Sequence, residues 1–418
     1  MKKIAIVGTG ISGLVSAYLL NREHDVHVFE ANDYIGGHTA TVDVEVEGKR
    51  WAIDTGFIVF NDRTYPHFER LLAQLGVKAK PTEMSFSVNN VQTGLEYNGH
   101  NLDTLFAQRR NLINPKFWSF ISEILRFNAK CKALWAEQSI DPELTLGDFL
   151  RQQHFSDFFS EHYILPMGAA IWSSSLADME AFSLLFFIRF FHNHGLLNIN
   201  DRPQWYVIEG GSRSYIDPLV ADFKDKIQLN TAVTRVERGD EGVVLTLNNG
   251  QQAFFDEVVL ACHSDQSLAM LADASEQERQ ILGDLAYSSN DVVLHTDTNL
   301  LPKRKKAWAA WNYQLNGQRD NPASVTYDMN ILQGLPADAP TFCVTLNQSH
   351  AIASDKILRE FKYMHPVFNQ ASLAAQQDRQ HICGQRHTHF AGAYWYNGFH
   401  EDGVRSALDV CQRFGLSL

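Results

Sequence analysis

A glycine-rich turn between an apolar strand and a helix constrains this chain more than any other feature. The strand runs from Ile4 to Val7, the turn reads G-T-G-I-S-G with glycines at Gly8, Gly10 and Gly13, and an apolar-periodic helix follows. A second strand, DVHVFE, ends at Glu30, 22 residues after Gly8. A strand, a glycine turn, a helix and a second strand with a terminal acid are typical of a dinucleotide-binding β-α-β unit.

The residue types of this turn suit a bound pyrophosphate. Gly8 permits the tight turn, Gly10 lets the backbone approach the phosphates, and Gly13 allows close packing of helix on strand. Ser12 lies at the start of the helix, where free N–H groups and the positive end of the dipole favour phosphate. Glu30 is expected to accept hydrogen bonds from the adenosine ribose, and its carboxylate would repel a 2′-phosphate, which disfavours NADP.

A second glycine pair separates FAD from NAD. Gly36 and Gly37 come six residues after Glu30 and are followed by His38 and Thr39. This second close-approach loop is not needed for NAD, whereas the longer, extended FAD can use it. We therefore predict FAD as the cofactor.

These motifs resemble those of the FAD-dependent amine oxidase and phytoene desaturase superfamily, in which an acid is followed by a Gly-Gly pair. Asp54-Thr55-Gly56 resembles the family's Asp-x-Gly turn beside the flavin, and EGGSRSYIDPL at 209–219 resembles its second Gly-Gly segment. The resemblance implies that Gly56 approaches the flavin and that Val233 contacts the adenine side through its backbone.

The segment FAGAYWYNGFHEDGVRSAL, at 390–408, resembles the closing motif of the same superfamily. The resemblance implies that Gly392 precedes a loop and a helix pointed at the flavin, and that N–H groups around Asp402 and Gly403 face the flavin N1 and C2 carbonyl. One departure is Ala393, where many members carry an acid that binds the ribityl chain.

The order of patterns along the chain predicts an α/β fold. A Rossmann-type FAD-binding domain is expected from the discontinuous segments 1–62, 207–270 and 385–418, and a second, mixed α+β substrate domain from 63–206 and 271–384. Helical periodicity covers 65–75, 115–135 and 146–185, strand patterning returns over 227–261 with a hairpin turn at 248–250, and a closing helix is expected near 402–414.

An apolar block points to the substrate. The stretch from Ala181 to Phe191 is about half the roughly 20 residues that a membrane-spanning helix needs. It is interpreted as a buried helix, with an apolar pocket wall or a membrane-facing surface as alternatives.

Within the superfamily the chain most resembles bacterial FAD-binding proteins similar to the flavoprotein region fused to plant cyclopropane fatty acid synthases, which implies a lipid acyl substrate. Substrate contacts are predicted for Trp172, Phe187, Tyr394 and Trp395, with simple packing as the alternative for the aromatic run 394–396.

Few side chains are obligatory for hydride transfer to a flavin. His400 and Tyr396 are the candidates for proton movement or substrate orientation, with a structural loop histidine as the alternative for His400. No metal is predicted, because His381, Cys383, His387 and His389 approach or lie on a strand whose side chains alternate faces. The basic run 303–306 is interpreted as a solvated loop or a contact to anionic headgroups.

Several function classes stay open at this point. An FAD-dependent oxidoreductase acting on an acyl lipid is preferred over an amine oxidase, a redox-neutral double-bond isomerase and a flavin-binding protein without turnover. The net charge of −12 argues against nucleic acid. Five scattered cysteines and a strand that begins at Lys2 indicate a reducing, cytoplasmic setting without a targeting segment. The oligomeric state and a peripheral membrane contact are left open.

Overall fold

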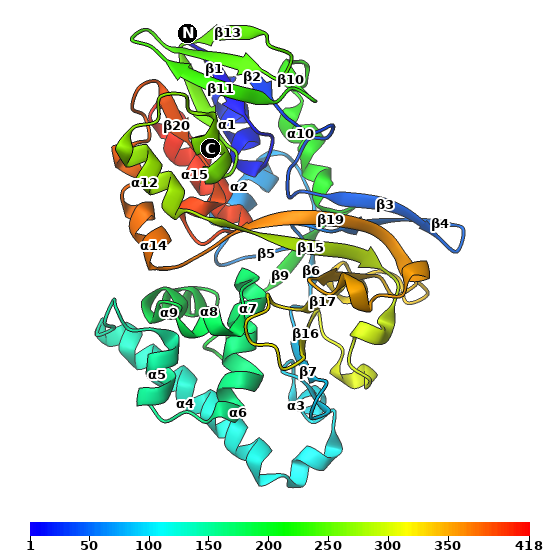
Figure 1. Cartoon of the computed structure of the whole chain (residues 1–418). Coiled ribbons are helices and arrows are strands. Elements are labelled where there is room, and N and C mark those ends of the chain that lie inside the picture. Colours follow the sequence, from blue (N-terminus) through cyan, green and yellow to red (C-terminus); the bar gives the residue numbers. More distant parts are fainter.

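A parallel sheet of five strands forms the centre of the upper half of the molecule in Figure 1, a computed structural model that describes residues 1–418. Its strands, in spatial order, are β10 (Ile227–Gln228), β2 (Asp25–Phe29), β1 (Lys3–Val7), β14 (Glu257–Leu260) and β20 (Thr388–Phe390). All neighbouring pairs are parallel. The sheet is thus assembled from distant parts of the chain, and the predicted α/β fold is confirmed.

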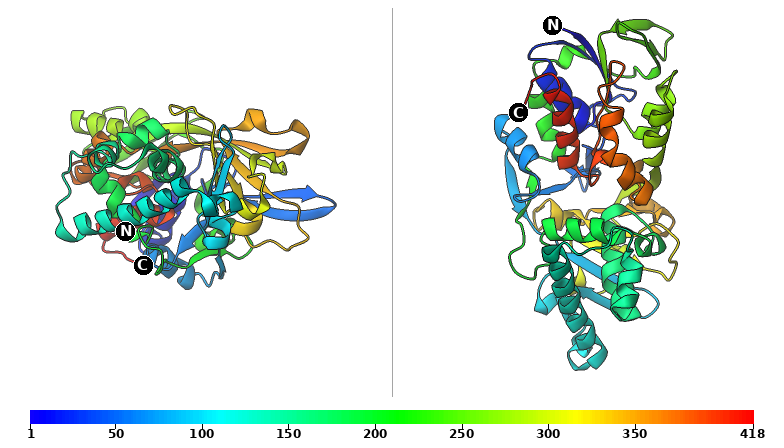
Figure 2. Two further views of the ribbon diagram at one scale, coloured as in Figure 1. Left: turned by 90° about the horizontal axis from the view of Figure 1, so that it is seen from below. Right: turned by 90° about the vertical axis from the view of Figure 1, so that its left-hand side faces the viewer.

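Two helices lie together against this sheet. Helix α1 (Ile11–Leu20) connects β1 to β2, and α15 (His400–Gln412) follows β20. The right-hand view of Figure 2 shows them side by side, in blue and red, near the two chain ends. Buried apolar residues on α1, such as Leu14 and Val15, join Val404 and Ala407 of α15 in one hydrophobic core.

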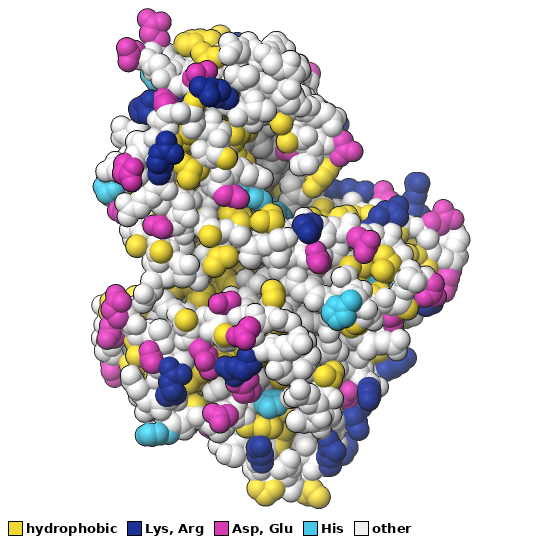
Figure 3. Space-filling model, viewed as in Figure 1, with side chains coloured by type: hydrophobic (Ala, Val, Ile, Leu, Met, Phe, Trp, Pro, Cys, Tyr) yellow, Lys and Arg dark blue, Asp and Glu magenta, His cyan; other side chains and the backbone are white.

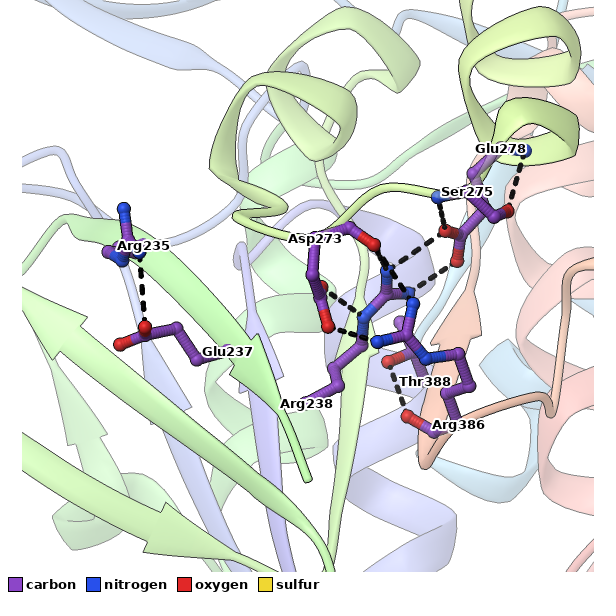
Figure 4. Close-up of polar contacts among 8 residues, drawn as sticks. All are labelled: Arg235, Glu237, Arg238, Asp273, Ser275, Glu278, Arg386 and Thr388. Carbon is purple, nitrogen blue, oxygen red and sulfur yellow. Dashed lines mark hydrogen bonds and ion pairs between the residues drawn. The ribbon is translucent and has the colours of Figure 1, made fainter. Parts of the chain in front are cut away.

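A three-stranded antiparallel sheet caps the upper half. It consists of β11 (Val233–Arg238), β12 (Val243–Leu247) and β13 (Gln252–Phe255), and the turn between β12 and β13 confirms the hairpin predicted at 248–250. Arg238 connects this sheet to α12 (Glu276–Asp284) and to the segment before it: its buried guanidinium contacts Asp273 at 2.8 Å and both oxygens of Glu278. Figure 4 shows this network, in which Arg386 also reaches Asp273.

A seven-stranded mixed sheet and a helical block form the lower half. The sheet order is β19-β15-β18-β17-β16-β7-β8, with β7 (Phe86–Asn90), β8 (Leu95–Asn98), β15 (Tyr287–His295), β16 (Trp311–Leu315), β17 (Val325–Asp328), β18 (Cys343–Leu346) and β19 (Ile357–Pro366). The block contains α3 (Leu102–Leu105), α4 (Pro115–Glu137), α5 (Leu146–Gln152), α6 (Asp157–Phe159), α7 (Leu165–Trp172), α8 (Leu176–Glu180) and α9 (Leu184–Asn193). The long strands β15 and β19 lie at the boundary between the upper and lower halves (Figure 1).

Helix α9 is buried within this block. Phe187, Ile188 and Phe191 are at most 1% exposed, so the buried-helix interpretation of Ala181 to Phe191 is confirmed and the membrane-facing alternative is wrong. The reason is that α9 packs against α4 and α5 and, through Phe187 and Phe190, against Trp172 of α7, so little of its surface reaches solvent. Among all helices of the chain, none combines the length and apolarity that crossing a membrane requires.

The remaining elements are smaller. They are the hairpin of β3 (Thr41–Val46) and β4 (Lys49–Asp54), the sheet of β5 (Val59–Asn61), β9 (Trp205–Ile208) and β6 (Ala79–Thr82), and the helices α2 (Pro66–Gln74), α10 (Ile216–Val220), α11 (Ser264–Met270), α13 (Met329–Leu332) and α14 (Gln370–Gln377). The domain limits stay a prediction. Phe68 of α2 and Ala375 of α14 lie outside the predicted cofactor segments, yet both pack into the core of the upper half.

Candidate functional site

The glycine turn lies at the carboxyl end of β1, where ligands of open α/β sheets bind. Gly8 has φ +103°, and a Cβ there would lie 2.8 Å from the carbonyl oxygen of Ala261. A Cβ at Gly13 would lie only 2.0 Å from the carbonyl oxygen of Gly8, so the helix and the turn touch. At Gly10, in contrast, a Cβ would meet no protein atom within 4 Å. Backbone at the start of α1 is therefore accessible here, which fits a pyrophosphate.

Glu30 organises the neighbouring loops from the end of β2. Its buried carboxylate accepts hydrogen bonds from Thr9, through N–H at 2.8 Å and Oγ1 at 2.6 Å, and from the N–H of Asn32 at 2.9 Å. The second glycine loop is tied to the same place, because Gly36 N–H donates to Thr9 Oγ1 at 3.3 Å. A Cβ at Gly37 would lie 3.2 Å from the Cα of Gly10, so the two glycine loops are in contact.

The start of β11 lies beside the same acid. Thr231 N–H donates to the carbonyl oxygen of Glu30 at 2.8 Å, two residues before Val233 begins the strand. The predicted adenine-side residue is thus placed near the carboxyl end of β2. Its role in cofactor binding stays a prediction.

The start of α15 packs against the start of α1. A Cβ at Gly403 would lie 2.5 Å from Cγ2 of Ile11, and Ser12 Oγ donates to the carbonyl oxygen of Gly403 at 3.0 Å. Gly392 joins them, because its N–H donates to Ser406 Oγ at 2.9 Å. Two helix N-termini, both favourable for negative charge, therefore lie next to each other.

Two acids at the start of α15 are occupied by backbone N–H groups. Asp402 accepts from Phe399 N–H at 2.9 Å and caps α15, and Glu401 accepts from Phe68 N–H at 2.9 Å at the start of α2. Burial raises the pKa of Asp402 to about 6 and the pKa of Glu401 to about 7. Both acids therefore fix the position of the α15 start, and Glu401 also ties α2 to it.

The loop after the second glycine pair packs on the Asp-x-Gly turn. A Cβ at Gly56 would lie 2.2 Å from the carbonyl oxygen of His38, and Phe57 N–H donates to the same oxygen at 2.7 Å. Asp54 accepts from Thr41 Oγ1 at 2.6 Å and from Ser212 N–H at 2.9 Å, and burial raises its pKa to about 6. Asp54 Oδ2 and His38 Nε2 are both buried without a hydrogen-bond partner. Such orphaned polar atoms in a glycine-lined region fit a bound polar cofactor.

Aromatic and imidazole rings gather around His38. Its ring centroid lies 5.2 Å from that of Tyr363, 5.7 Å from that of His365 and 6.4 Å from that of His263. Burial and neighbouring imidazoles lower the pKa of His38 to about 3 and that of His365 to about 4, so both rings are neutral. Sequence reasoning missed Tyr363 and His365. Their spacing of two on a strand, which places both on one face, was the available signal.

His365 links this histidine cluster to the lower half. Its Nδ1 lies 2.9 Å from Ser173 Oγ, directly after Trp172 at the end of α7. The Trp172 ring lies 4.9 Å from Phe190, which stacks on Phe399 at 5.2 Å. We call Trp172, Phe190 and Phe399 the aromatic wall. Phe187, by contrast, is fully buried and stacks on Phe191 at 3.9 Å inside the helical block.

His400 is packed rather than free. Its ring stacks on Phe57 at 3.7 Å, and its Nε2 lies 2.8 Å from the hydroxyl of Tyr215, which lies 2.5 Å from Thr39 Oγ1. Burial, together with the nearby His38, lowers the pKa of His400 to about 3. This environment favours the structural-histidine alternative, and the catalytic role stays a prediction.

The three aromatic residues 394–396 do not form one wall. Tyr394 and Trp395 are buried in the core of the upper half. The hydroxyl of Tyr396 donates to Asp409 at 2.5 Å, and Arg405 lies over its ring at 3.9 Å. Since Asp409 is in the second half of α15, this hydroxyl points away from the helix start, where the other predicted cofactor residues meet.

The histidines on and before β20 do not converge on one point. His387 Nδ1 and His389 Nε2 lie 3.7 Å and 3.3 Å from Glu257, whereas His381 pairs with Asp378. In the whole chain, no three His, Cys, Asp or Glu side chains are arranged to hold a metal ion.

Comparison with known proteins gives a family match. The family model described as flavin containing amine oxidoreductase matches residues 11–356. A Mycobacterium tuberculosis protein named as a flavin-containing monoamine oxidase, AofH, is 26% identical over 259 residues, which are 59% of this chain and 54% of that protein. An L-amino-acid oxidase of Siganus canaliculatus is 24% identical over 273 residues, 63% of this chain and 49% of its own. The chain thus spans about half the length of these curated relatives.

Solved structures share the fold over nearly the whole chain. A putrescine oxidase double mutant aligns with a TM-score of 0.69 and 15% identity, covering 99% of both chains. Cyclohexylamine oxidase from Brevibacterium oxydans aligns at 0.68 and 16%, also over 99% of both. A fatty acid isomerase from P. acnes that produces CLA aligns at 0.68 and 15%, over 99% of this chain and 98% of its own.

Proposed function

The chain belongs to the family of flavin-containing amine oxidoreductases, and from that premise we propose that it oxidises an apolar acyl substrate. The family confirms the predicted FAD cofactor and the predicted class of FAD-dependent oxidoreductase. The acyl substrate is the part that this proposal adds.

The residues that would hold FAD are those around the two glycine loops. The open backbone at Gly10 and the start of α1 suit the pyrophosphate, and Glu30 suits the adenosine ribose. The start of α15 at Asp402 and Gly403 lies next to α1, where its N–H groups would stabilise negative charge on the flavin. When bound, FAD supplies a hydride acceptor at its N5 position.

The observation that carries the substrate proposal is that the rings and polar side chains in contact with His38 and His365 include no carboxylate. The pKa values of His38 and His365 are lowered by burial and by other imidazoles, and no carboxylate contributes to either shift. A cationic amine is stabilised by nearby carboxylates or by the faces of aromatic rings. Neutral imidazoles without a carboxylate partner, next to Ser173 at the end of α7, instead favour an uncharged, apolar substrate.

The chain's own groups would orient such a substrate and exclude water. Each buried methylene contributes about 0.8 kcal/mol, so an acyl chain packed on aromatic side chains gains affinity without polar contacts. His365 is held by Ser173 and lies 3.3 Å from the amide nitrogen of Asn290, so its ring is fixed at the end of the aromatic wall. The fold also occurs in a fatty acid isomerase, which supports an acyl substrate in this architecture.

Amine oxidation is the second candidate, favoured by the names of AofH, putrescine oxidase and cyclohexylamine oxidase. The two activities differ in which compound reduces the flavin without oxygen. Anaerobic mixing of the FAD-loaded protein with long-chain acyl lipids is expected to bleach the flavin absorbance, whereas polyamines and aromatic amines leave it unchanged. Bleaching by an amine and by no lipid would overturn the proposal, and a shifted double bond without bleaching would favour the isomerase.

A variant pair links this reaction to the described site. His365→Gln should slow bleaching by the lipid at least tenfold while the FAD content stays at the wild-type level. His350→Gln, at an exposed histidine, is the matched control and should have no effect. Equal rates in all three proteins would show that the substrate does not pass His365.

A further inference from the structure

One end of the lower half concentrates positive charge in a chain that is acidic overall. Residues 99–118 and 302–308 contain seven basic residues and a single acid, Asp103, whereas the whole chain has 36 basic and 48 acidic residues. All seven are exposed: Arg109, Arg110, Lys116, Lys303, Arg304, Lys305 and Lys306. Asp103 is itself paired with Arg109 and, at 2.7 Å, with Lys306, and Arg304 is paired at 3.0 Å with Glu96, which precedes these segments. Seven basic residues thus face these two acids. Positive charge therefore dominates this end.

Large apolar side chains are exposed at the same end. Leu102 is 73% exposed, Leu112 47%, Ile113 87% and Trp118 49%. These four come from α3, the turn before α4 and the first turn of α4, so they lie within 17 residues of one another in the chain. Clusters of exposed apolar residues on a soluble protein mark interaction sites.

Hydrogen bonds and ion pairs hold the two kinds of residue on one surface. Trp118 Nε1 donates to the carbonyl oxygen of Leu112 at 2.9 Å, which fixes the indole beside the exposed turn. The Lys306 pair with Asp103 joins the basic run to α3, next to Leu102. Figure 3 shows hydrophobic side chains at the lowest point of the molecule, with Lys and Arg beside them. We call this region the tip surface.

We propose that the tip surface docks on a lipid bilayer that contains anionic lipids. Leu112, Ile113 and Trp118 would enter the interface between headgroups and acyl chains, and the basic residues would contact the anionic headgroups. Tryptophan suits this depth, because its ring is apolar and its N–H is polar. The inference extends the proposed function and rests on it for its purpose, since an acyl lipid substrate is present in such a bilayer.

Two other occupants fit the surface less well. A second copy of the chain would bring two strongly basic surfaces together, which is repulsive. A nucleic acid would pair with the basic residues but would leave Ile113 and Leu112 without apolar contacts.

Vesicle co-sedimentation of the FAD-loaded protein tests the proposal without any turnover. The protein is expected to pellet with phosphatidylcholine vesicles that contain phosphatidylglycerol and to stay in solution with pure phosphatidylcholine. Lys305→Ala with Lys306→Ala should weaken binding about 25-fold, since each basic residue near an anionic surface contributes about fivefold (~1 kcal/mol). Ile113→Ser should weaken binding at least fivefold through the loss of its buried apolar side chain.

Matched controls separate the tip surface from general effects. Ile199→Ser changes another isoleucine that is 61% exposed, and Arg50→Ala with Lys356→Ala removes two charges elsewhere. Both controls should bind as the wild type does. Binding that is absent, or equal for both vesicle types, or unchanged in Ile113→Ser would overturn the proposal. So would Ile113-dependent dimers, or binding of duplex DNA with no binding to vesicles.

The result is independent of the substrate assay. Vesicle binding with flavin bleaching by amines alone would refute the acyl substrate and leave the docking surface standing. Bleaching by detergent-dissolved lipid without vesicle binding would refute the docking surface and leave the proposed function standing.

Discussion

Substituting Gly10 and Gly13 by alanine should separate cofactor binding from folding, although both glycines belong to one motif. A Cβ at Gly10 meets no protein atom within 4 Å, and the residue has φ −64° and ψ 172°, which alanine adopts without strain. Gly10→Ala is therefore expected to change the unfolding free energy of the FAD-free protein by less than about 1 kcal/mol. Its methyl group would, however, fill the space in which the backbone meets the pyrophosphate.

Gly13→Ala is expected to destabilise the FAD-free protein instead. Its Cβ would lie 2.0 Å from the carbonyl oxygen of Gly8, a backbone atom that cannot move without shifting α1 from β1. The FAD-free protein should lose at least about 2 kcal/mol of unfolding free energy, in the range of overpacked cores. Gly13→Ala should therefore lose stability, whereas Gly10→Ala should lose affinity for FAD.

The assay combines urea unfolding of the FAD-free proteins with FAD titration followed by flavin fluorescence. Gly10→Ala should bind FAD at least 100-fold more weakly than the wild type, which corresponds to about 2.7 kcal/mol. Wild-type affinity in Gly10→Ala would refute the placement of the pyrophosphate at this turn. Strong destabilisation of the FAD-free Gly10→Ala protein would show that the space around Gly10 is not free.

The remaining predictions concern three buried carboxylate contacts. Glu30→Gln should weaken FAD binding about tenfold, less than Gly10→Ala, because an amide loses the charge and keeps an acceptor oxygen for either Thr9 or Asn32, which donate to different oxygens of Glu30; affinity equal to the wild type in the same titration would contradict this. Arg238→Met leaves Glu278 buried without its partner and should lower the unfolding free energy, measured with urea, by about 3–5 kcal/mol. Adding Glu278→Leu should restore most of that free energy. No recovery would show that the loss does not come from an unpaired Glu278. Burial raises the pKa of Glu401 from 4.5 to about 7, so between those values the folded state binds a proton that the unfolded state does not, and stability falls as pH rises. Unfolding free energies of the wild type relative to Glu401→Gln should therefore drop by about 2–3 kcal/mol from pH 4.5 to 7.5, and a flat difference would count against the raised pKa.

The cofactor half could be predicted from the sequence where the determinants are local. Gly8, Gly10, Gly13 and Glu30 lie within one β-α-β unit, so their spacing alone places them at one edge of the sheet. The start of α15 was predicted by resemblance rather than by spacing. Its contact with Ser12 depends on two parallel strands from opposite ends of the chain, β1 and β20, both flanking β14.

The histidine cluster could not be predicted, because it depends on pairing between distant strands. His365 lies opposite Ser288, and Tyr363 opposite Asn290, in the antiparallel pair of β15 and β19. No local pattern sets this register or brings His38 alongside it. The same limit applies to His400: its position at a helix start is visible in the sequence, whereas its packing on Phe57 is not.

The sequence of the apolar block correctly predicts that it is buried, but does not say whether it lines a pocket or fills the core. The composition of 182–191 predicts burial equally for a pocket wall and for a core. The structure places Phe187 in the core, whereas Phe190 reaches Phe399 at the junction of the two halves. Only the orientation of α9, set by α4 and α7, separates these two neighbours on one helix.

The affinity of the FAD-loaded protein for a series of saturated acyl compounds of increasing length tests the substrate claim most directly. Saturated chains report on binding between His365 and the aromatic wall, and the shift of the flavin absorbance under anaerobic conditions measures it. We expect Kd to fall about fourfold for each added methylene, which corresponds to about 0.8 kcal/mol, until the chain exceeds the site. A Kd independent of chain length, together with tighter binding of amines as the pH rises and they become neutral, would contradict the account.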